Sequence, residues 1–197
     1  MDRAGIETLL MNIYRNLDRD KIQFDFLVQT DKKNDYEDEI YKLGGRIYRI
    51  KRLNVLKPYK FYSDLRKFFK NHNEYKIVHS HINTFSKIVL KAATKENIKV
   101  KIAHAHISYP GFNLKTIIKY LYRLNINKYA DYKFACSNDA AKWVFGNNKE
   151  YILFKNGIEY EKFLYNDKIR NKIRKDLGLS SNDILIGHVG RFNKQKN

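Results

Sequence analysis

Short runs of β-branched and aromatic residues alternate with longer helical patterns along nearly the whole chain, and this alternation constrains the fold more than any other feature. A strand, a helix and a second strand in succession form a βαβ unit, in which the two strands run parallel. We expect strands at Ile22–Val28, Arg46–Ile50, Lys76–His81, Val100–His106, Tyr132–Cys136, Tyr151–Phe154 and Ile184–Val189. We expect helices at Ile6–Asn16, Tyr36–Leu43, Pro58–Asn71, Thr84–Glu96, Asn113–Tyr129 and Asn138–Phe145. The sequence therefore predicts an α/β protein with a Rossmann-like, doubly wound parallel sheet.

Three local signals support the predicted boundaries. Gly44-Gly45 can end a helix, Pro58 suits a first helical turn, and Ser137 is placed to cap the helix that follows Cys136. The segment from Tyr160 to Leu179 has a charged, helical pattern that ends at Gly178. We therefore expect a Rossmann-like domain over residues 1–165, a linker or crossover over 166–182, and the start of a second Rossmann-like domain over 183–197.

Both ends of the chain are unusual for this architecture. A doubly wound sheet normally opens with a strand, whereas this chain opens at the turn Met1–Gly5 that would follow such a strand. The last segment, Gly187–Asn197, has a strand pattern and a basic loop with no helix behind it. We therefore expect truncation at both ends, with the first strand of the sheet missing.

Composition excludes several other classes of protein. Hydrophobic residues make up 43% of the chain, which is enough to build a core, so an intrinsically disordered chain is excluded. The sequence contains no apolar run of the length that spans a bilayer, and Met1–Gly5 does not resemble a signal peptide. The single cysteine, Cys136, fits a reducing compartment. We therefore expect a cytoplasmic protein.

The chain is strongly basic, with 39 Lys and Arg against 21 Asp and Glu and a formal net charge of +18. Positive potential of this size favours anionic partners such as nucleic acid, acidic lipid or phosphorylated metabolites. A biased genomic composition explains the charge as well. The sequence shows no helix-turn-helix, zinc-ligand or ribonucleoprotein signature, so we expect no nucleic-acid partner.

Two His-x-His pairs, at His79 and His81 and at His104 and His106, each end a predicted strand. The two-residue period places both members of a pair on one face, and ligands of open α/β sheets bind at the carboxyl ends of the strands. Histidines that hydrogen-bond beneath covering helices are one alternative. Four imidazoles holding zinc are another, but neither pair has a Cys, Asp or Glu beside it, so we expect no metal.

Three further segments are candidate binding elements. The loop Asp2–Thr8 opens a helix whose backbone N–H groups could face an anion, although an ordinary helix start explains it equally. Asn156-Gly157 predicts either a hairpin turn or a loop between domains. Arg191 and Lys196 follow the last predicted strand, where they could clamp a diphosphate; a solvated basic tail is the alternative.

In their order and spacing these motifs resemble the retaining, sucrose-synthase-like group of GT-B glycosyltransferases, especially the bacterial members that build exopolysaccharide and capsule. The resemblance covers nearly the whole chain. The matching segments are Ala4–Thr8, Ile77–His81, Ile102–His106, Cys136-Ser137, Asn156–Glu159 and Gly190–Phe192 with Lys196. Ala4 departs from the glycine that is usual in the first of these segments, which restricts the backbone of that loop.

The resemblance implies transfer of a sugar from a nucleotide donor to a hydroxyl group of a saccharide or lipid-linked acceptor, without a cofactor or a metal. It implies a catalytic role for His81, contacts to the donor diphosphate from Gly5, Arg191 and Lys196, and an acceptor cleft lined by His79, His104, His106, Asn156 and Gly157.

The family's donor pocket would lie beyond Asn197, so we expect these residues alone to be inactive and poorly stable. A non-catalytic interaction or regulatory protein derived from such a domain is the alternative. For the complete enzyme, the charge predicts a peripheral position on the inner face of the cell membrane. The basic residues expected to contact the membrane are Lys57, Lys60, Arg66, Lys67, Lys115, Lys119 and Arg123.

Overall fold

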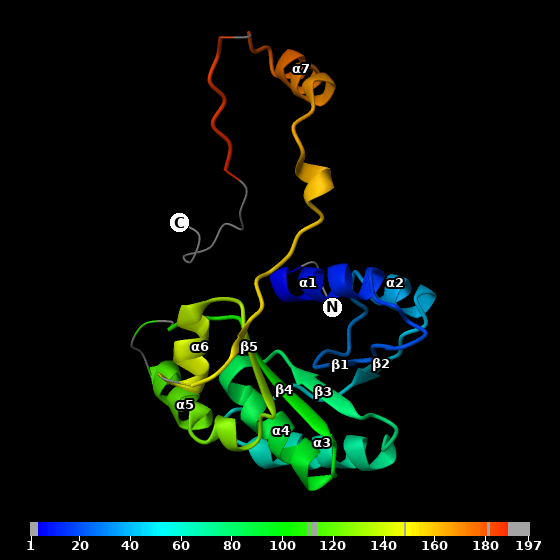
Figure 1. The fold of residues 1–197 in the computed structure, drawn as a ribbon, viewed down its shortest axis with the longest axis vertical. Coiled ribbons are helices and arrows are strands. Elements are labelled where there is room, and N and C mark those ends of the chain that lie inside the picture. The colour runs from blue at the N-terminus through cyan, green and yellow to red at the C-terminus, as the bar shows by residue number, and fades with distance from the viewer. Residues whose placement is uncertain (1–3, 110, 112–113, 148, 181, 189–197) are drawn as a thin grey trace. The chain divides into compact units, whose positions relative to one another are not determined.

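The computed structural model describes residues 4–109, 111, 114–147, 149–180 and 182–188 (Figure 1). The chain divides into two compact units, Met1–Ile158 and Glu159–Asn197. The first unit contains α1 (Gly5–Arg15), β1 (Phe26–Val28), α2 (Glu37–Lys42), β2 (Ile47–Arg49), α3 (Pro58–Asn71), β3 (Ile77–Ser80), η1 (Asn83–Phe85), α4 (Ser86–Lys95), β4 (Val100–Ala105), α5 (Leu114–Arg123), η2 (Ile126–Lys128), β5 (Tyr132–Ala135), α6 (Asn138–Phe145) and β6 (Ile152–Leu153).

The strands of the first unit form two parallel sheets, which confirms the predicted α/β class. β1 pairs with β2, and the second sheet has the order β3-β4-β5-β6. β1 and β3, which correspond to the strands predicted at Ile22–Val28 and Lys76–His81, belong to different sheets. In the larger sheet His79 is in register with Ile102, and His104 with Phe134, so the histidines of β3 and β4 share one face.

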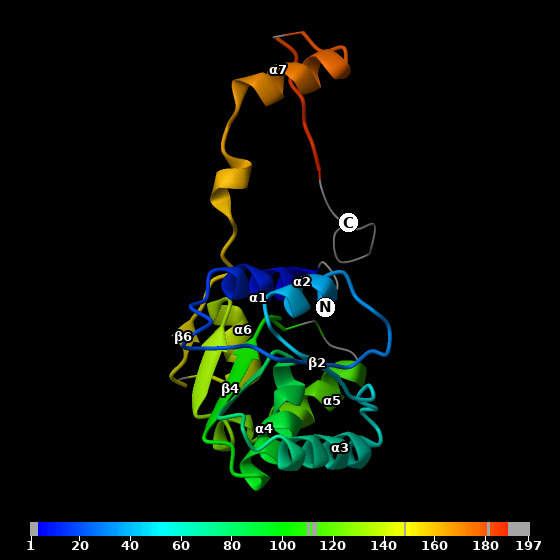
Figure 2. The same ribbon diagram turned by 90° about the vertical axis from the view of Figure 1, so that its right-hand side faces the viewer.

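The opposite face of the larger sheet carries small residues, which let helices approach closely. Ala103, Ala105 and Ala135 are fully buried there against α4 and α6. Along α3, Phe61, Leu65 and Phe69 follow a helical spacing and pack against α4, which lies beside α3 in both views (Figures 1 and 2). A third cluster packs α1 and α2 against β1 through Met11, Tyr14, Phe26, Val28, Tyr36 and Ile40.

The predicted boundary signals are confirmed. The Ser137 hydroxyl accepts a hydrogen bond from the Ala140 N–H at 3.1 Å, and Pro58 occupies the first turn of α3. Gly44 has a φ of +84°, a conformation that favours glycine. A Cβ on Gly45 would lie 2.7 Å from the Tyr14 hydroxyl and 2.8 Å from the Phe24 carbonyl oxygen, so only glycine lets α2 end against α1 in this way.

Three predicted helices are shorter than expected. α2 spans Glu37–Lys42, and the predicted end residues Tyr36 and Leu43 are its caps. Thr84 lies in the η1 turn that precedes α4 rather than in a continuous helix. The helix predicted over Asn113–Tyr129 ends at Arg123, and residues 112 and 113 lie outside the described residues. Asn125, with a φ of +64°, then starts the separate η2 turn. A left-handed residue interrupts the backbone ladder that a single helix would need.

The second unit contains η3 (Tyr160–Phe163) and α7 (Asp167–Asp176). The Asn166 side chain caps α7 by accepting from the Ile169 N–H at 3.0 Å. The strand predicted over Ile184–Val189 is wrong for residues 184–188, which form no strand, and residue 189 lies outside the described residues. A strand needs a hydrogen-bonded neighbour, and the described part of this unit contains no other strand.

Candidate functional site

The four histidines of the two His-x-His pairs form one cluster at the carboxyl edge of the larger sheet, as predicted. His79 and His104 lie within β3 and β4, and His81 and His106 follow directly after these strands. The strand alternation turns their neighbours Ser80, Ala103 and Ala105 to the opposite face, where these three residues are buried.

The four rings pack closely against one another. The ring centroids of His79 and His81 are 4.2 Å apart, and those of His104 and His106 are 4.1 Å apart. Across the two strands, His79 stacks on His104 at 5.3 Å with an interplanar angle of 7°. Phe134 lies edge-on to both His79 and His104, so the cluster has an apolar wall on its β5 side.

One hydrogen bond joins the two pairs. Nδ1 of His81 lies 2.9 Å from Nε2 of His106. One of these nitrogens must carry the proton and the other must accept it, so the tautomer of one neutral ring sets the tautomer of the other. Within the described part of the chain, no hydrogen-bond partner reaches His79 Nε2, His106 Nδ1 or either ring nitrogen of His104, although all four atoms are buried.

The environment keeps these rings neutral. Burial lowers the pKa of His106 from 6.5 to about 4. Burial, together with the neighbouring imidazoles, lowers the pKa of His79 to about 4 and that of His104 to about 3. The pKa of His81 is also held well below its usual value, first by burial and then by the other three rings. At neutral pH the cluster therefore presents uncharged nitrogens that can donate or accept hydrogen bonds.

Asn83 supports the site and was missed by the sequence analysis. Its side-chain Oδ1 accepts from the backbone N–H of His106 at 2.7 Å and from that of Ile107 at 3.2 Å. Its own backbone has a φ of +55°, which Asn tolerates better than most residues. An Asn two residues after a His-x-His pair was the available signal. The loop after β3 is thereby fixed to the end of β4.

The other predicted site residues are not brought to the imidazoles. Gly5 is the exposed first residue of α1, and Asn156 and Gly157 lie in an exposed segment after β6 that is not a hairpin turn. The Gly157 carbonyl oxygen accepts from Asn12 Nδ2 of α1 at 3.4 Å. In the described part of the chain, no hydrogen bond or ring contact joins these residues to the cluster. Arg191 and Lys196 lie outside the described residues.

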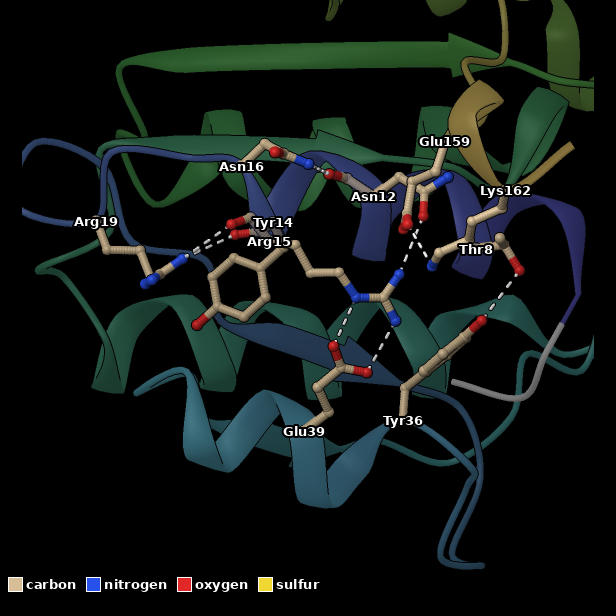
Figure 3. Close-up of polar contacts among 10 residues, drawn as sticks. All are labelled: Thr8, Asn12, Tyr14, Arg15, Asn16, Arg19, Tyr36, Glu39, Glu159 and Lys162. Carbon is tan, nitrogen blue, oxygen red and sulfur yellow. Dashed lines mark hydrogen bonds and ion pairs between the residues drawn. The ribbon is translucent and has the colours of Figure 1, made fainter. Parts of the chain in front are cut away.

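Helix α1 is bound to α2 and to Tyr36, the residue before α2 (Figure 3). The Arg15 guanidinium donates to both carboxylate oxygens of Glu39, at 2.6 and 2.9 Å. The Thr8 hydroxyl lies 3.2 Å from the Tyr36 hydroxyl. These contacts hold the helix that carries Gly5 in place, and they occupy the Thr8 side chain of the predicted anion-binding loop.

A pocket of about 590 Å³ follows the carboxyl ends of β4 and β5, and the sequence analysis did not find it. It is lined by Ser108, Tyr109, Arg123, Asp139, Lys142, Trp143 and Asn147. The Arg123 guanidinium lies over the Trp143 ring, 5.4 Å from its centroid, and Tyr109 meets that ring edge-on. Aromatic walls with a few charged groups suit a polar ligand that has apolar faces, such as a sugar.

Comparison with known proteins shows the family to which this chain belongs. The family model described as "Glycosyltransferase Family 4" matches residues 3–161, so this chain belongs to that family. The chain is 32% identical over 204 residues to "Putative glycosyltransferase EpsF" of Bacillus subtilis (strain 168), covering 100% of this chain and 53% of that protein.

Solved structures share the fold. The Anabaena protein HepE, in a crystal structure of its complex with UDP, superposes with a TM-score of 0.64 at 14% identity, over 89% of this chain and 47% of HepE. Its complex with UDP and glucose gives a TM-score of 0.63. The chain thus has an α/β fold similar to that of GT-B glycosyltransferases and spans about half the length of the proteins it matches.

Proposed function

We propose that this chain forms the acceptor side of a retaining glycosyltransferase that moves a sugar from a nucleotide-sugar to a hydroxyl group of a saccharide acceptor in exopolysaccharide or capsule biosynthesis. The observation that carries this proposal is the cluster of neutral imidazoles at the carboxyl edge of a parallel sheet. The likeness to EpsF and to the UDP complexes of HepE supports it.

His81 is the residue that we place against the reacting groups. Its ring is neutral, and its Nδ1 is paired with His106, so its Nε2 is either a defined donor or a defined acceptor for an acceptor hydroxyl. The pocket around Tyr109 and Trp143 begins two residues after His106, and we assign the acceptor saccharide to it. Asp139 and Arg123 would then hydrogen-bond sugar hydroxyls.

The donor contacts rest on the family resemblance. Gly5, Arg191 and Lys196 would approach the diphosphate, where cations stabilise the negative charge that grows as the sugar leaves. The reaction then needs no cofactor beyond the nucleotide-sugar. Because the chain spans about half the length of its relatives, we expect the 197 residues alone to bind acceptor without turning over donor.

The test is a transfer assay on the longest polypeptide that the gene encodes. A panel of UDP-, GDP- and dTDP-sugars is offered with saccharide acceptors, and proton NMR of the product gives the anomeric configuration. The proposal expects one donor class to react, with retention. An active enzyme that inverts the configuration would refute the retaining mechanism, and a folded protein that binds no nucleotide-sugar would refute the whole proposal.

We also propose that the acceptor is lipid-linked and that the enzyme sits on the inner face of the cell membrane. No helix in the described residues is long and apolar enough to cross a bilayer. α5, however, exposes Ile117, Tyr120 and Leu121 close to Lys119 and Arg123, and Leu56 and Tyr59 are 78% and 71% exposed at the start of α3. Apolar side chains beside cations favour an anionic membrane surface.

One of the expected membrane contacts is already occupied: Arg66 donates to Glu96 at 2.6 Å. Lys57 and Lys60 are exposed. The Lys57→Glu, Lys60→Glu double variant should lose flotation with anionic vesicles, and high salt should release the unmodified protein to a similar extent. The matched control is the Lys32→Glu, Lys42→Glu double variant, which changes two exposed lysines before and at the end of α2 and should float normally. Equal loss in both variants would show only a general effect of charge.

A further inference from the structure

The histidine cluster contains an unusual number of buried nitrogens without hydrogen-bond partners. Both ring nitrogens of His104, together with His79 Nε2 and His106 Nδ1, lack a partner among the described residues. His104 is 2% exposed. Buried polar atoms nearly always have a partner, and each one that does not carries a cost in stability. A ligand that accepts nitrogen lone pairs would offset this cost.

The geometry suits a metal ion. One ring nitrogen from each of His79, His81 and His104 lies within 4.8 Å of the other two. Zinc binds imidazole nitrogens at about 2.0–2.1 Å in a tetrahedral arrangement, which sets the ligand nitrogens about 3.4 Å apart. Binding therefore requires ring rotations that shorten these separations to about 3.4 Å.

We propose that His79, His81 and His104 form a binding site for a divalent transition-metal ion such as Zn²⁺, with the His106 ring orienting His81. Three histidines alone hold catalytic zinc in other enzymes, so the lack of a nearby Cys, Asp or Glu does not exclude the site. Mg²⁺ and Ca²⁺ prefer oxygen ligands and do not fit it.

Two features prepare the cluster for binding. The lowered pKa values leave the nitrogen lone pairs free of protons at neutral pH, as ligands must be. A metal-bound histidine usually donates its other N–H to a fixed acceptor, and His106 Nε2, 2.9 Å from His81 Nδ1, is placed to accept it.

The ion and the acceptor hydroxyl would compete for His81. This competition rests on the proposed sugar transfer, whereas the binding of the ion does not. Bound zinc would therefore inhibit transfer rather than assist it.

The test is metal binding by the full chain, prepared without a polyhistidine tag and stripped with a chelator. Titration with CoCl₂ should give visible d–d bands that saturate at one equivalent, and ZnCl₂ should displace the cobalt with measurable heat in calorimetry. MgCl₂ should produce neither signal. Absence of both the bands and the heat would overturn the proposal and leave a cluster that is filled by water.

Variants locate the site. His106→Gln removes the group that orients a ligand and should weaken binding by about 10- to 100-fold. His79→Gln and His104→Gln each remove a ligand and should weaken binding by more than His106→Gln does. The matched control, His72→Ala with His188→Ala, removes the two histidines outside the cluster and should bind normally. Melting curves with and without ZnCl₂ are recorded for each variant. If His104→Gln does not fold, His79→Gln is used instead, because His79 is only partly buried. Unchanged affinity in folded His79→Gln would refute the proposed ligand set.

Discussion

The two ends of the β3–β6 sheet differ in whether their buried polar side chains have hydrogen-bond partners. At the amino end, Lys101 is 9% exposed, and its Nζ pairs with the Asp131 carboxylate at 2.8 Å and donates to the Ile98 carbonyl oxygen at 3.2 Å. The same carboxylate accepts from the Lys101 backbone N–H at 2.7 Å. At the carboxyl end, His104 is as deeply buried, yet no described residue bonds its ring nitrogens.

This difference indicates that the buried polar groups at the amino end contribute to stability, whereas those at the carboxyl end are candidates for function. Satisfied buried groups fix a fold, whereas unsatisfied ones mark a place where another molecule completes the bonding. The Lys101–Asp131 pair at the amino end therefore links β4 to the start of β5, and we propose that the carboxyl end binds a ligand. Variants at the two ends should accordingly change different measurements.

The largest effect is expected on catalysis. His81→Ala in the longest polypeptide that the gene encodes should lower kcat by about 10²- to 10⁴-fold, as loss of an acid–base or hydrogen-bonding group does. The variant should also lose some stability, because His106 Nε2 loses its hydrogen-bond partner, but the loss of kcat should exceed the loss of stability. Lys101→Met is the matched variant at the other end and should keep its kcat. Parallel losses of kcat and stability in His81→Ala would favour a structural role for the ring.

The second prediction concerns pH in the presence of a chelator. The pKa values of His79 and His106 fall from 6.5 to about 4 on folding, so the unfolded chain binds more protons between these values. The contribution of each neutral ring to the free energy of unfolding is therefore fully present above about pH 6.5. It is lost as the pH drops towards 4, by about 3 kcal/mol for one such ring. Urea titrations at several pH values measure the free energy of unfolding. His79→Gln should flatten the curve, and an unchanged slope would show that the rings are hydrated.

Third, the ion pair at the amino end should matter for folding alone. Asp131→Asn leaves the buried Lys101 cation without its charge partner and should cost about 2 kcal/mol, less than a fully buried pair because the Asp131 side chain is 42% exposed. Lys101→Met should cost less, since it removes the buried charge itself. Urea unfolding measures both, with Asp20→Asn as an exposed control. A larger loss for Lys101→Met would reverse this explanation.

The smallest effect tests whether position at the carboxyl end is enough for function. Ser137 follows β5 at that end, but its hydroxyl is committed to the Ala140 N–H. Ser137→Ala should cost about 1 kcal/mol of stability and leave kcat unchanged. Ser63→Ala, at an exposed position inside α3, is the control and should be neutral or slightly stabilising. A fall in kcat for Ser137→Ala would weaken the distinction between paired and unpaired groups.

Most of the first unit could be predicted from the sequence because its signals are local. The bounds of α3 and α6 were predicted to the residue by Pro58 and by the Ser137 cap, and the two His-x-His pairs predicted the cluster because parallel strands bring their carboxyl ends together. The failures depend on partners distant in sequence. Ile184 has a strand pattern but no neighbouring strand in the described part of its unit, and the role of Asn83 depends on β4, which is far from it along the chain.

The bond between His81 and His106 has a consequence for how this sequence can diverge. Because one ring must donate where the other accepts, a substitution that fixes one partner as a donor or as an acceptor restricts what the other position can hold. The two sites, 25 positions apart, are therefore expected to change together across related genes. An alignment in which they vary independently would indicate that natural selection does not act on this bond.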